Sequence, residues 1–315
     1  MSEEKKKLDL SQLKDTDPII GYEQEEEAEL VELNSTWDNI VNTFKKSPLA
    51  IIGLVIIAFL VITAIFAPVM TKWDPYTNDL SMSLSKPGVD GHLLGTDCFG
   101  RDLLTRLFRG TRISLLIAFI TVFINVFIGV VYGAISAYYG GWTDIILTHL
   151  AEVLDGLPYV VITILFMLIF GSGMFSIILA LCVTGWIGTS RLIRAQFYRF
   201  KGREYVLAAR TLGVKDRTLI FRHILPTCVG PLITRAMIAI PGAIFSESFL
   251  AYIGLGIKAP EPSIGILLSD GQSVLLQYPY QTIFPAVLIS VLMIAFNLFA
   301  NGLRDALDPS KRGEA

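Results

Sequence analysis

Charged side chains are scarce in this chain, and so are cysteines. Asp, Glu, Lys and Arg make up 17% of the 315 residues, whereas hydrophobic residues make up 53%. Such a balance indicates an integral membrane protein rather than a water-soluble one. The cysteines Cys98, Cys182 and Cys228 are odd in number and widely separated. They therefore predict neither a disulfide framework nor a zinc site, and we interpret them as structural.

Sequence motifs of covalent chemistry are also missing. The chain contains no GxxxxGK[ST] phosphate-binding loop, no HExxH helix and no GxSxG turn. His92, His149 and His223 fall far apart in the expected topology. We therefore expect no catalytic residue, no metal and no directly bound cofactor, and we expect no nucleic-acid partner. The first 48 residues are polar and predict no cleavable signal peptide.

Long uncharged runs predict six transmembrane helices. Residues 49–70 carry no charge over 22 positions, which at about 1.5 Å per residue is enough to cross a hydrocarbon core of roughly 30 Å. Gly171, Ser172 and Gly173 divide a longer charge-free stretch into a hairpin of two helices. The other spans are expected at residues 113–139, about 149–170, about 174–191, about 236–257 and about 282–302. The expected fold class is an all-α integral membrane protein.

The distribution of Lys and Arg predicts the orientation. With a cytosolic N-terminus, 19 of the 26 basic residues fall on the inner side and 7 on the outer side. Cytosolic loops of membrane proteins carry the excess of Lys and Arg, so both termini are expected in the cytosol.

A charged segment between the fourth and fifth predicted spans interrupts the apolar pattern. Residues 203–226 read REYVLAARTLGVKDRTLIFRHILP. We predict a helix over residues 200–212, a turn at Gly213, and a second short helix over residues 215–224 that Pro226 stops. Four apolar side chains are expected to anchor a binding partner: Tyr205, Leu212, Leu219 and Ile220. The alternative is a basic inner loop that only satisfies topology.

This segment resembles the cytoplasmic "EAA" loop of permease subunits of ATP-binding-cassette (ABC) importers. Ala208, Ala209, Gly213 and the ILP at residues 224–226 carry the resemblance, whereas Leu207 stands in place of the motif's glutamate. The resemblance implies that residues 199–226 form a coupling loop that docks into a separate ATPase subunit. The implied contact residues are Glu204, Tyr205, Ala208, Ala209, Gly213, Leu219, His223 and Pro226.

Further segments resemble the C-type permease subunit of oligopeptide and dipeptide ABC importers. They are residues 36–75, residues 92–115 (HLLGTDCFGRDLLTRLFRGTRISL) and residues 246–271 (SESFLAYIGLGIKAPEPSIGILLSDG). The resemblance implies the type I ABC importer permease fold in a bacterial cell membrane. The implied partners are a second homologous permease subunit, two cytosolic ATPase subunits that use ATP and Mg²⁺, and an external peptide-binding protein.

Other functions remain open on the sequence. Nickel and glutathione importers share this permease pattern, so the substrate is not fixed by it. A self-contained secondary transporter and a membrane scaffold are alternatives of other classes, and internal inverted repeats, which would favour the secondary transporter, are not evident.

The basic residues on the predicted outer side gather after the first span. Residues 101–109 have apolar positions at helical spacing and predict a helix lying at the outer interface. Asp97 and Arg101 are four residues apart, as are Asp102 and Arg106, so some of the outer positive charge is expected to be paired locally. With residues 258–271, this helix is expected to form an outer gate or to contact the binding protein. The candidate residues are Arg101, Asp102, Arg106 and Lys258.

Ionisable residues within the predicted spans are candidates for the translocation pathway. Glu247 is expected near the middle of the fifth span, facing the bundle or a wet cavity. Glu152 and Asp155 are expected near the start of the third span, where a position at the inner interface is the alternative. Gly129 and Gly133 form a small-xxx-small pair that predicts close helix packing in the second span.

The chain divides into four expected regions. Residues 1–35 are expected to form an acidic cytosolic tail. Residues 36–48 carry apolar side chains along one helical face and predict an amphipathic surface helix. Residues 49–303 are the six-span permease domain, and residues 304–315 are a cytosolic C-terminal tail.

Overall fold

A computed structural model describes residues 40–307 of the chain, and every regular element within them is a helix. Residues 40–45 are helical and precede the first long helix. The long and short α-helices that follow are α2 (Pro48–Met70), α3 (Leu103–Tyr139), α4 (Gly141–Asp155), α5 (Tyr159–Phe170), α6 (Met174–Gly185), α7 (Ile187–Phe200), α8 (Glu204–Thr211), α9 (Asp216–Thr218), α10 (Val229–Tyr252), α11 (Ile264–Ser273) and α12 (Tyr280–Leu307).

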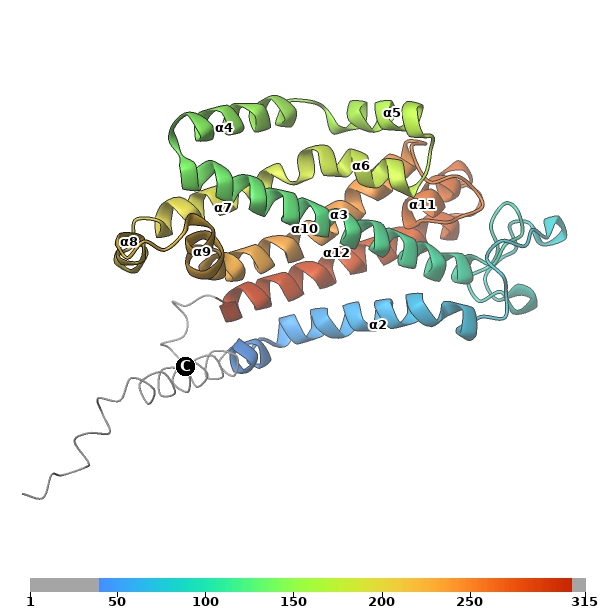
Figure 1. Cartoon of the computed structure of the whole chain (residues 1–315). Helices are drawn as coiled ribbons and strands as arrows, with labels where there is room; N and C mark the ends of the chain where they lie inside the picture. Colours follow the sequence, from blue (N-terminus) through green and yellow to red (C-terminus); the bar gives the residue numbers. More distant parts are fainter. Residues whose placement is uncertain (1–39, 308–315) are drawn as a thin grey trace, which may run out of the picture.

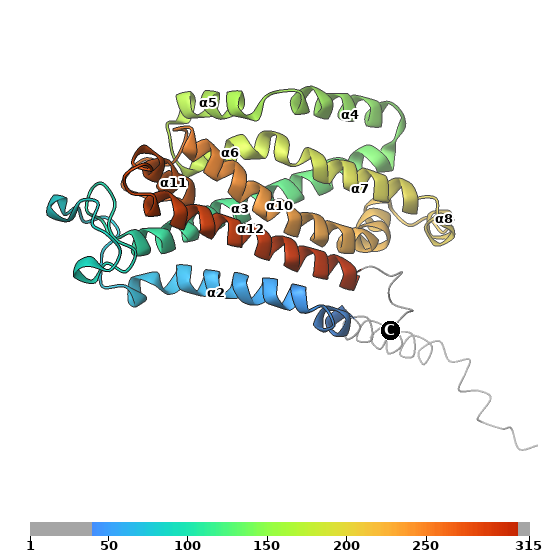
Figure 2. The ribbon, with the colours of Figure 1, turned by 180° about the vertical axis from the view of Figure 1, so that it is seen from behind.

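The long helices lie side by side in a bundle with two distinct ends. Figure 1 shows α2 on one face, α4 and α5 on the opposite face, and α3, α6, α7, α10 and α12 between them. The connection from α2 to α3 and the short helix α11 lie at one end. Helices α8 and α9, the first described residues and the end of α12 lie at the other (Figures 1 and 2). We refer to these as the α11 end and the α8 end.

Within residues 40–307, five helical stretches are long and apolar enough to cross a membrane, and the bent pair α4 and α5 raises the number to six if it counts as one span. The span predicted over about 149–170 corresponds to this pair and is not one continuous helix, because α4 and α5 meet at 81°. Pro158 explains the break: its ring fixes φ, and it disfavours helical geometry at the residue before it.

Helix α3 is longer than predicted. The sequence predicts a separate interfacial helix over residues 101–109, but α3 runs without interruption from Leu103 to Tyr139. The Asp102 side chain caps its first turn by accepting a hydrogen bond from the backbone N–H of Thr105. Gly110 does not break the helix; a Cβ atom there would lie 3.0 Å from the backbone carbon of Ser263, so this glycine permits a close contact.

The fourth predicted span is also longer in the structure, because α6 is continued by α7 to Phe200. Arg191, Arg194 and Arg199 thus lie on a helix and not on a loop. Helix α7 packs along α3, as the glycine pair predicted. A Cβ atom at Gly129 would lie 2.6 Å from Thr189 Cβ, and one at Gly133 would collide with the backbone oxygen of Ser190.

The hydrophobic core follows the length of the bundle. Its central cluster joins α2, α3, α10 and α12 through Leu60, Leu115, Ile240, Ile244 and Phe296. Many large apolar side chains outside the core are exposed, including Phe59, Phe123 and Leu168. A surface of this kind suits contact with lipid or with another subunit.

Residues 1–39 and 308–315 lie outside the described residues. Most of the predicted terminal regions falls within these two ranges. At the described edge, the Phe44 ring packs edge-on against Phe299 of α12, with 5.7 Å between the ring centres. Helix α12 continues to Leu307, so the predicted boundary between residues 303 and 304 falls inside it.

Candidate functional site

Residues 199–226, the predicted coupling loop, are called the docking segment from here on. They have the expected order of helix, glycine turn and helix. Helix α8 covers Glu204–Thr211, and the residue that turns the chain after it is Gly213, with a φ of 78°. This left-handed backbone region favours glycine, so the predicted role of Gly213 in the turn is confirmed. Helix α9 follows over Asp216–Thr218.

Apolar side chains project from α8 and from the turn after it. Tyr205 and Leu207 are each nearly half exposed, and Leu212 is 84% exposed. Ala208 is exposed beside them, with no bulky side chain to keep a partner away. Exposed apolar groups at the end of the bundle that carries many charges are typical of a protein–protein contact.

Two predicted anchors are wrong. Leu219 is 1% exposed, and Ile220 packs against the same buried cluster as Val206 and Phe197. Their side chains complete the core beneath α8 because the second half of the segment folds back onto α7 and α3. His223 is half-buried, whereas Glu204 and Pro226 are exposed.

Pro226 does not stop the second helix, contrary to the prediction. Residues Leu219–Ile224 form a π-helical turn, Leu225–Cys228 form a 3-10 turn, and α10 begins at Val229. Pro226 lies in the first turn of the 3-10 segment, a position that suits proline because its fixed φ matches the start of a helix. The docking segment is thereby continuous with α10.

The end of α3 holds the docking segment in place. The Tyr138 hydroxyl donates a hydrogen bond to the carboxylate of Asp216 in α9. The ammonium of Lys201, just before α8, donates to the backbone oxygen of Ala137 at 2.8 Å. Sequence reasoning missed these contacts, because Tyr138 stands at the end of an apolar run, 78 residues before Asp216, and no local pattern joins them.

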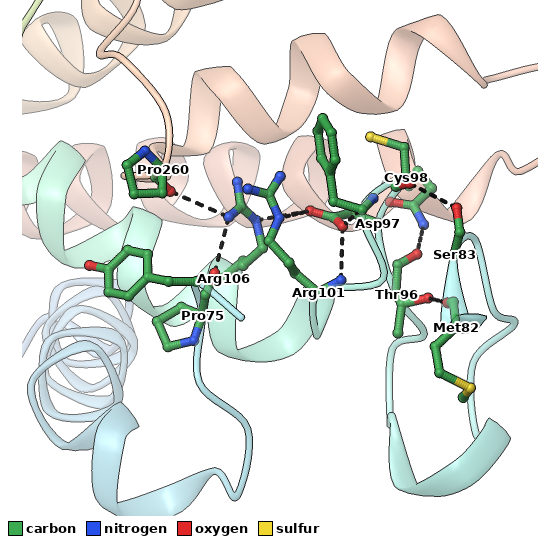
Figure 3. Close-up of polar contacts among 12 residues, drawn as sticks. Pro75, Met82, Ser83, Thr96, Asp97, Cys98, Arg101, Arg106 and Pro260 are labelled. Carbon is green, nitrogen blue, oxygen red and sulfur yellow. Dashed lines mark hydrogen bonds and ion pairs between the residues drawn. The ribbon is translucent and has the colours of Figure 1, made fainter. Parts of the chain in front are cut away.

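A buried polar cluster occupies the α11 end. The Asp97 carboxylate accepts a hydrogen bond from Arg101 Nε at 2.7 Å and lies 3.2 Å from Arg106 Nε (Figure 3). Arg101 and Arg106 are 6% and 2% exposed. The predicted pair of Asp97 and Arg101 is therefore confirmed, and Arg106 joins it.

The second candidate pair, Asp102 and Arg106, does not form. The Asp102 carboxylate faces the N-terminus of α3, where it accepts from the N–H and the hydroxyl of Thr105, and it lies 2.9 Å from His92 Nδ1. The His92 ring in turn stacks on Trp73, with 4.1 Å between ring centres. Capping a helix places a carboxylate against backbone N–H groups and turns it away from the residue four positions on.

The segment 258–271 is not only a loop, because α11 begins within it at Ile264. Lys258 is exposed, whereas Arg101, Asp102 and Arg106 are buried and face the interior of the α11 end. Burial raises the pKa of Asp270 in α11, and the nearby Arg106 and Arg101 counteract part of that rise. Of the four candidate residues, Lys258 alone is placed to meet a partner directly.

Glu247 faces the bundle interior, as predicted, and is 0% exposed. Its Oε2 atom accepts a hydrogen bond from the Ser114 hydroxyl of α3 at 2.8 Å, while Oε1 has no hydrogen-bond partner among the described residues. The predicted position along the span is wrong: α10 ends at Tyr252, so Glu247 lies near the α11 end and not in the middle.

Glu152 and Asp155 lie on α4 and are exposed. Asp155 forms an ion pair with Arg191 of α7 at 2.8 Å, next to the break between α4 and α5. Glu152 pairs with His149 at 3.0 Å and lines a cavity of about 160 Å³ between α3, α4 and α7. The structure does not bring these two carboxylates together with Glu247.

Comparisons with known proteins give a consistent result. The sequence model of a family described as "Binding-protein-dependent transport system inner membrane component" matches residues 126–313. A second, described as "N-terminal TM domain of oligopeptide transport permease C", matches residues 35–87.

Curated relatives match over most of the chain. An oligopeptide transport system permease protein from Bacillus subtilis (strain 168) is 41% identical over 278 residues, which cover 88% of this chain and 91% of that protein. A dipeptide transport system permease protein from the same organism is 39% identical over 298 residues, covering 93% and 92%. An oligopeptide transport system permease protein from Escherichia coli (strain K12) is 36% identical, covering 90% and 94%.

A solved structure shares the fold. A chain of the inward-facing MetNI methionine ABC transporter aligns with a TM-score of 0.55 and 16% identity, covering 65% of this chain and 98% of that one. At this identity the match supports the fold alone, and it agrees with the helical arrangement described above.

Proposed function

Because the chain belongs to the family of binding-protein-dependent transport system inner membrane components, we propose that it is the permease subunit of an ABC importer for oligopeptides or dipeptides. It is a multi-pass protein of the bacterial cell membrane and acts as a transport subunit, not as an enzyme. Peptide is the proposed substrate class because the relatives named above are peptide permeases and match along almost their whole length.

The docking segment is the proposed coupling site. The observation that carries this proposal is a set of exposed apolar side chains on α8 and its turn, in a segment fixed to α3 and continuous with α10. A cytosolic ATPase subunit that covers this surface would bury the apolar groups and move the segment when ATP and Mg²⁺ close the ATPase pair. The α8 end is then the cytosolic end, with both termini on that side.

A second, homologous permease subunit is proposed to complete the translocation pathway. Glu247, Asp155 and Glu152 are the candidates on this chain, and the exposed pair of Asp155 and Arg191 is costly in lipid. Contact with a partner subunit or with a water-filled path would remove that cost. An external peptide-binding protein is proposed to dock at the α11 end, where Lys258 is exposed.

Leu212→Ser tests the coupling proposal. Leu212 is 84% exposed in the isolated chain, so the substitution should leave membrane insertion unchanged. Loss of a buried apolar anchor at an interface costs about 1–3 kcal/mol, so recovery of ATPase subunits with the tagged chain and uptake of labelled oligopeptide should both fall about tenfold. The matched control is Leu276→Ser, a 99% exposed leucine at the opposite end, which should leave ATPase recovery unchanged.

A deletion of residues 207–214 should abolish uptake and ATPase stimulation while the chain still inserts. Normal uptake in that deletion would refute the coupling role. Competition of labelled peptide uptake by nickel or glutathione would reassign the substrate, and uptake by the purified chain without ATPase subunits would indicate a secondary transporter.

A further inference from the structure

One stripe of α3 contacts a single stretch of the connection between α10 and α11. The stripe consists of residues 106, 109, 110 and 114, which recur at helical spacing on one face. Their contacts run in order along the connection: Pro260, Glu261, Ser263 and Ile264. The two segments are therefore in a fixed register over more than two helical turns.

Arg106 adds a third segment to this contact. Its Nη1 atom donates to the backbone oxygen of Pro75, in the connection from α2 to α3, at 3.1 Å, and lies 3.5 Å from the backbone oxygen of Pro260 (Figure 3). The side chain is 2% exposed, and Asp97 neutralises it. A buried guanidinium joins the two carbonyl groups from opposite sides.

Arg109, one turn further along α3, contacts the same two segments, but through their side chains and not through their backbone carbonyls. Its guanidinium makes two contacts with the Glu261 carboxylate, at 3.3 and 3.4 Å. The same carboxylate accepts a hydrogen bond from the Tyr76 hydroxyl at 2.8 Å. Arg109 also lies over the Tyr76 ring, 5.9 Å from its centre.

The two layers join neighbouring residues of the same two segments. Residue 75 meets residue 260 through Arg106, whereas residue 76 bonds residue 261 directly and Arg109 holds the same carboxylate. We name these four positions together with the two arginines the α3 clamp. Two successive bridges from one rigid helix prevent the segments from sliding past each other, whereas a single contact would allow rotation.

We propose that Arg106 and Arg109 are positioning residues of the transport cycle, which hold the α2–α3 and α10–α11 connections together so that they move as one body with α3. The proposal rests on the proposed function, in which the α11 end faces the outside and receives the peptide-binding protein. Since α11 follows directly after the clamped stretch, it is carried with the same body.

The test uses the pair of Arg109 and Glu261, because their side chains are partly exposed, at 31% and 38%. Removing Arg106 would take one of its two guanidinium partners from the buried Asp97 carboxylate and the shared donor from two carbonyl groups, and that variant could fail to fold. The variants are Arg109→Glu, Glu261→Arg and the double reversal. Lys86→Glu is the matched control, since it makes the same charge change at an exposed position of the α2–α3 connection outside the clamp.

Two measurements are made on the whole complex, purified through a tag on this chain. The first is amide hydrogen exchange in residues 72–79 and 258–266. The second is the maximal rate of ATP-driven uptake of labelled oligopeptide in vesicles. Each single reversal should raise exchange in both segments together and lower the maximal rate about fivefold, as expected for loss of a partly exposed ion pair. The double reversal should restore both quantities, and Lys86→Glu should change neither.

Different results overturn different claims. Exchange that rises in one segment only, or that the double reversal does not restore, would show that the clamp does not join the two segments. Raised exchange with an unchanged uptake rate would show that the clamp has no role in transport. Absence of ATP-driven uptake in the unmodified complex would overturn the proposed function, and the exchange data would still decide whether the clamp exists.

Discussion

At the scale of single residues, Ser114 shows how one hydroxyl can serve three helices. It donates to the Glu247 carboxylate of α10 at 2.8 Å and accepts from the backbone N–H of Ile264, the first residue of α11, at 3.3 Å. Both groups are buried, so each would cost free energy if it lost its partner. Ser114 therefore ties α10 and α11 to α3.

Replacing Ser114 by Ala should lower the free energy of unfolding by about 1–3 kcal/mol, because the buried N–H of Ile264 loses its acceptor and the Glu247 carboxylate loses the nearer of its two hydroxyl donors. Thermal unfolding of the detergent-purified complex measures the loss. Thr121→Val is the control: this residue is buried on the same helix, and its hydroxyl oxygen has no hydrogen-bond partner among the described residues. The control should unfold at an unchanged or higher temperature. Equal losses in the two variants would contradict the role given to Ser114.

The burial of Glu247 could be predicted from the sequence, but its partners could not. An acidic residue in an apolar run predicts a side chain that turns away from lipid. Ser114 lies 133 residues earlier, and nothing in a single sequence indicates that the two positions meet. The same holds for Arg109 and Glu261, which are 152 residues apart.

At the scale of helices, glycines and prolines account for most of what differs from the prediction. Gly110 and Gly133 lie inside α3 and permit close contacts without ending the helix. Pro158 breaks a predicted span, whereas Pro226 starts a turn that leads into α10. The effect of each residue depends on its position relative to the helix ends, which hydropathy alone does not locate.

Gly133→Ala should destabilise the packing of α3 on α7. The added Cβ atom would collide with the backbone oxygen of Ser190, so the two helices must separate, at a cost of about 1–3 kcal/mol. The measurement is the midpoint of thermal unfolding. Gly242→Ala inside α10 is the matched control, because a Cβ atom there meets nothing within 4 Å. The control should gain stability from the higher helix propensity of Ala, and a loss as large as that of Gly133→Ala would refute the packing argument.

At the scale of the whole molecule, the order of the spans could be predicted, because an uncharged run long enough to cross the hydrocarbon core is typical of a transmembrane helix. The sequence predicts six, and the described residues give five, or six with the bent pair counted as one. The 81° bend between α4 and α5 and the continuity of α3 could not be predicted. Pro158 accounts for the place of the bend but not for its angle, and α3 continues past Gly110 where that glycine contacts the distant Ser263. The loop at the α8 end was predictable in outline, from its charge and its glycine, but its attachment to Tyr138 was not.

Thiol labelling should test the proposed orientation. Cys98 is exposed at the α11 end, whereas Cys182 and Cys228 are buried. A membrane-impermeant maleimide should therefore label Cys98 in intact cells, and Gly213→Cys, in a Cys98→Ser background, only after the cells are opened. Labelling of the Gly213 variant in intact cells would reverse the orientation.

The rate at which Cys98 is labelled should also depend on pH. Partial burial and the neighbouring Asp97 carboxylate raise the pKa of the Cys98 thiol above its ordinary value. The thiolate is the reactive form, so less of it is present near pH 7 than for a free cysteine, and labelling should accelerate as the pH rises toward 9. A rate at pH 7 equal to that of an unhindered thiol would contradict the proximity of Asp97.

Helix α3 reaches from Tyr138, beside the docking segment, to Arg106 in the clamp, within a single element of 37 residues. At about 1.5 Å per residue it is roughly 55 Å long, well beyond the thickness of the hydrocarbon core. Such a rod acts as a lever: each degree of tilt about one tip displaces the other by roughly 1 Å. If α3 tilts as the proposed coupling requires, a movement at the α8 end would reach the α11 end within one element.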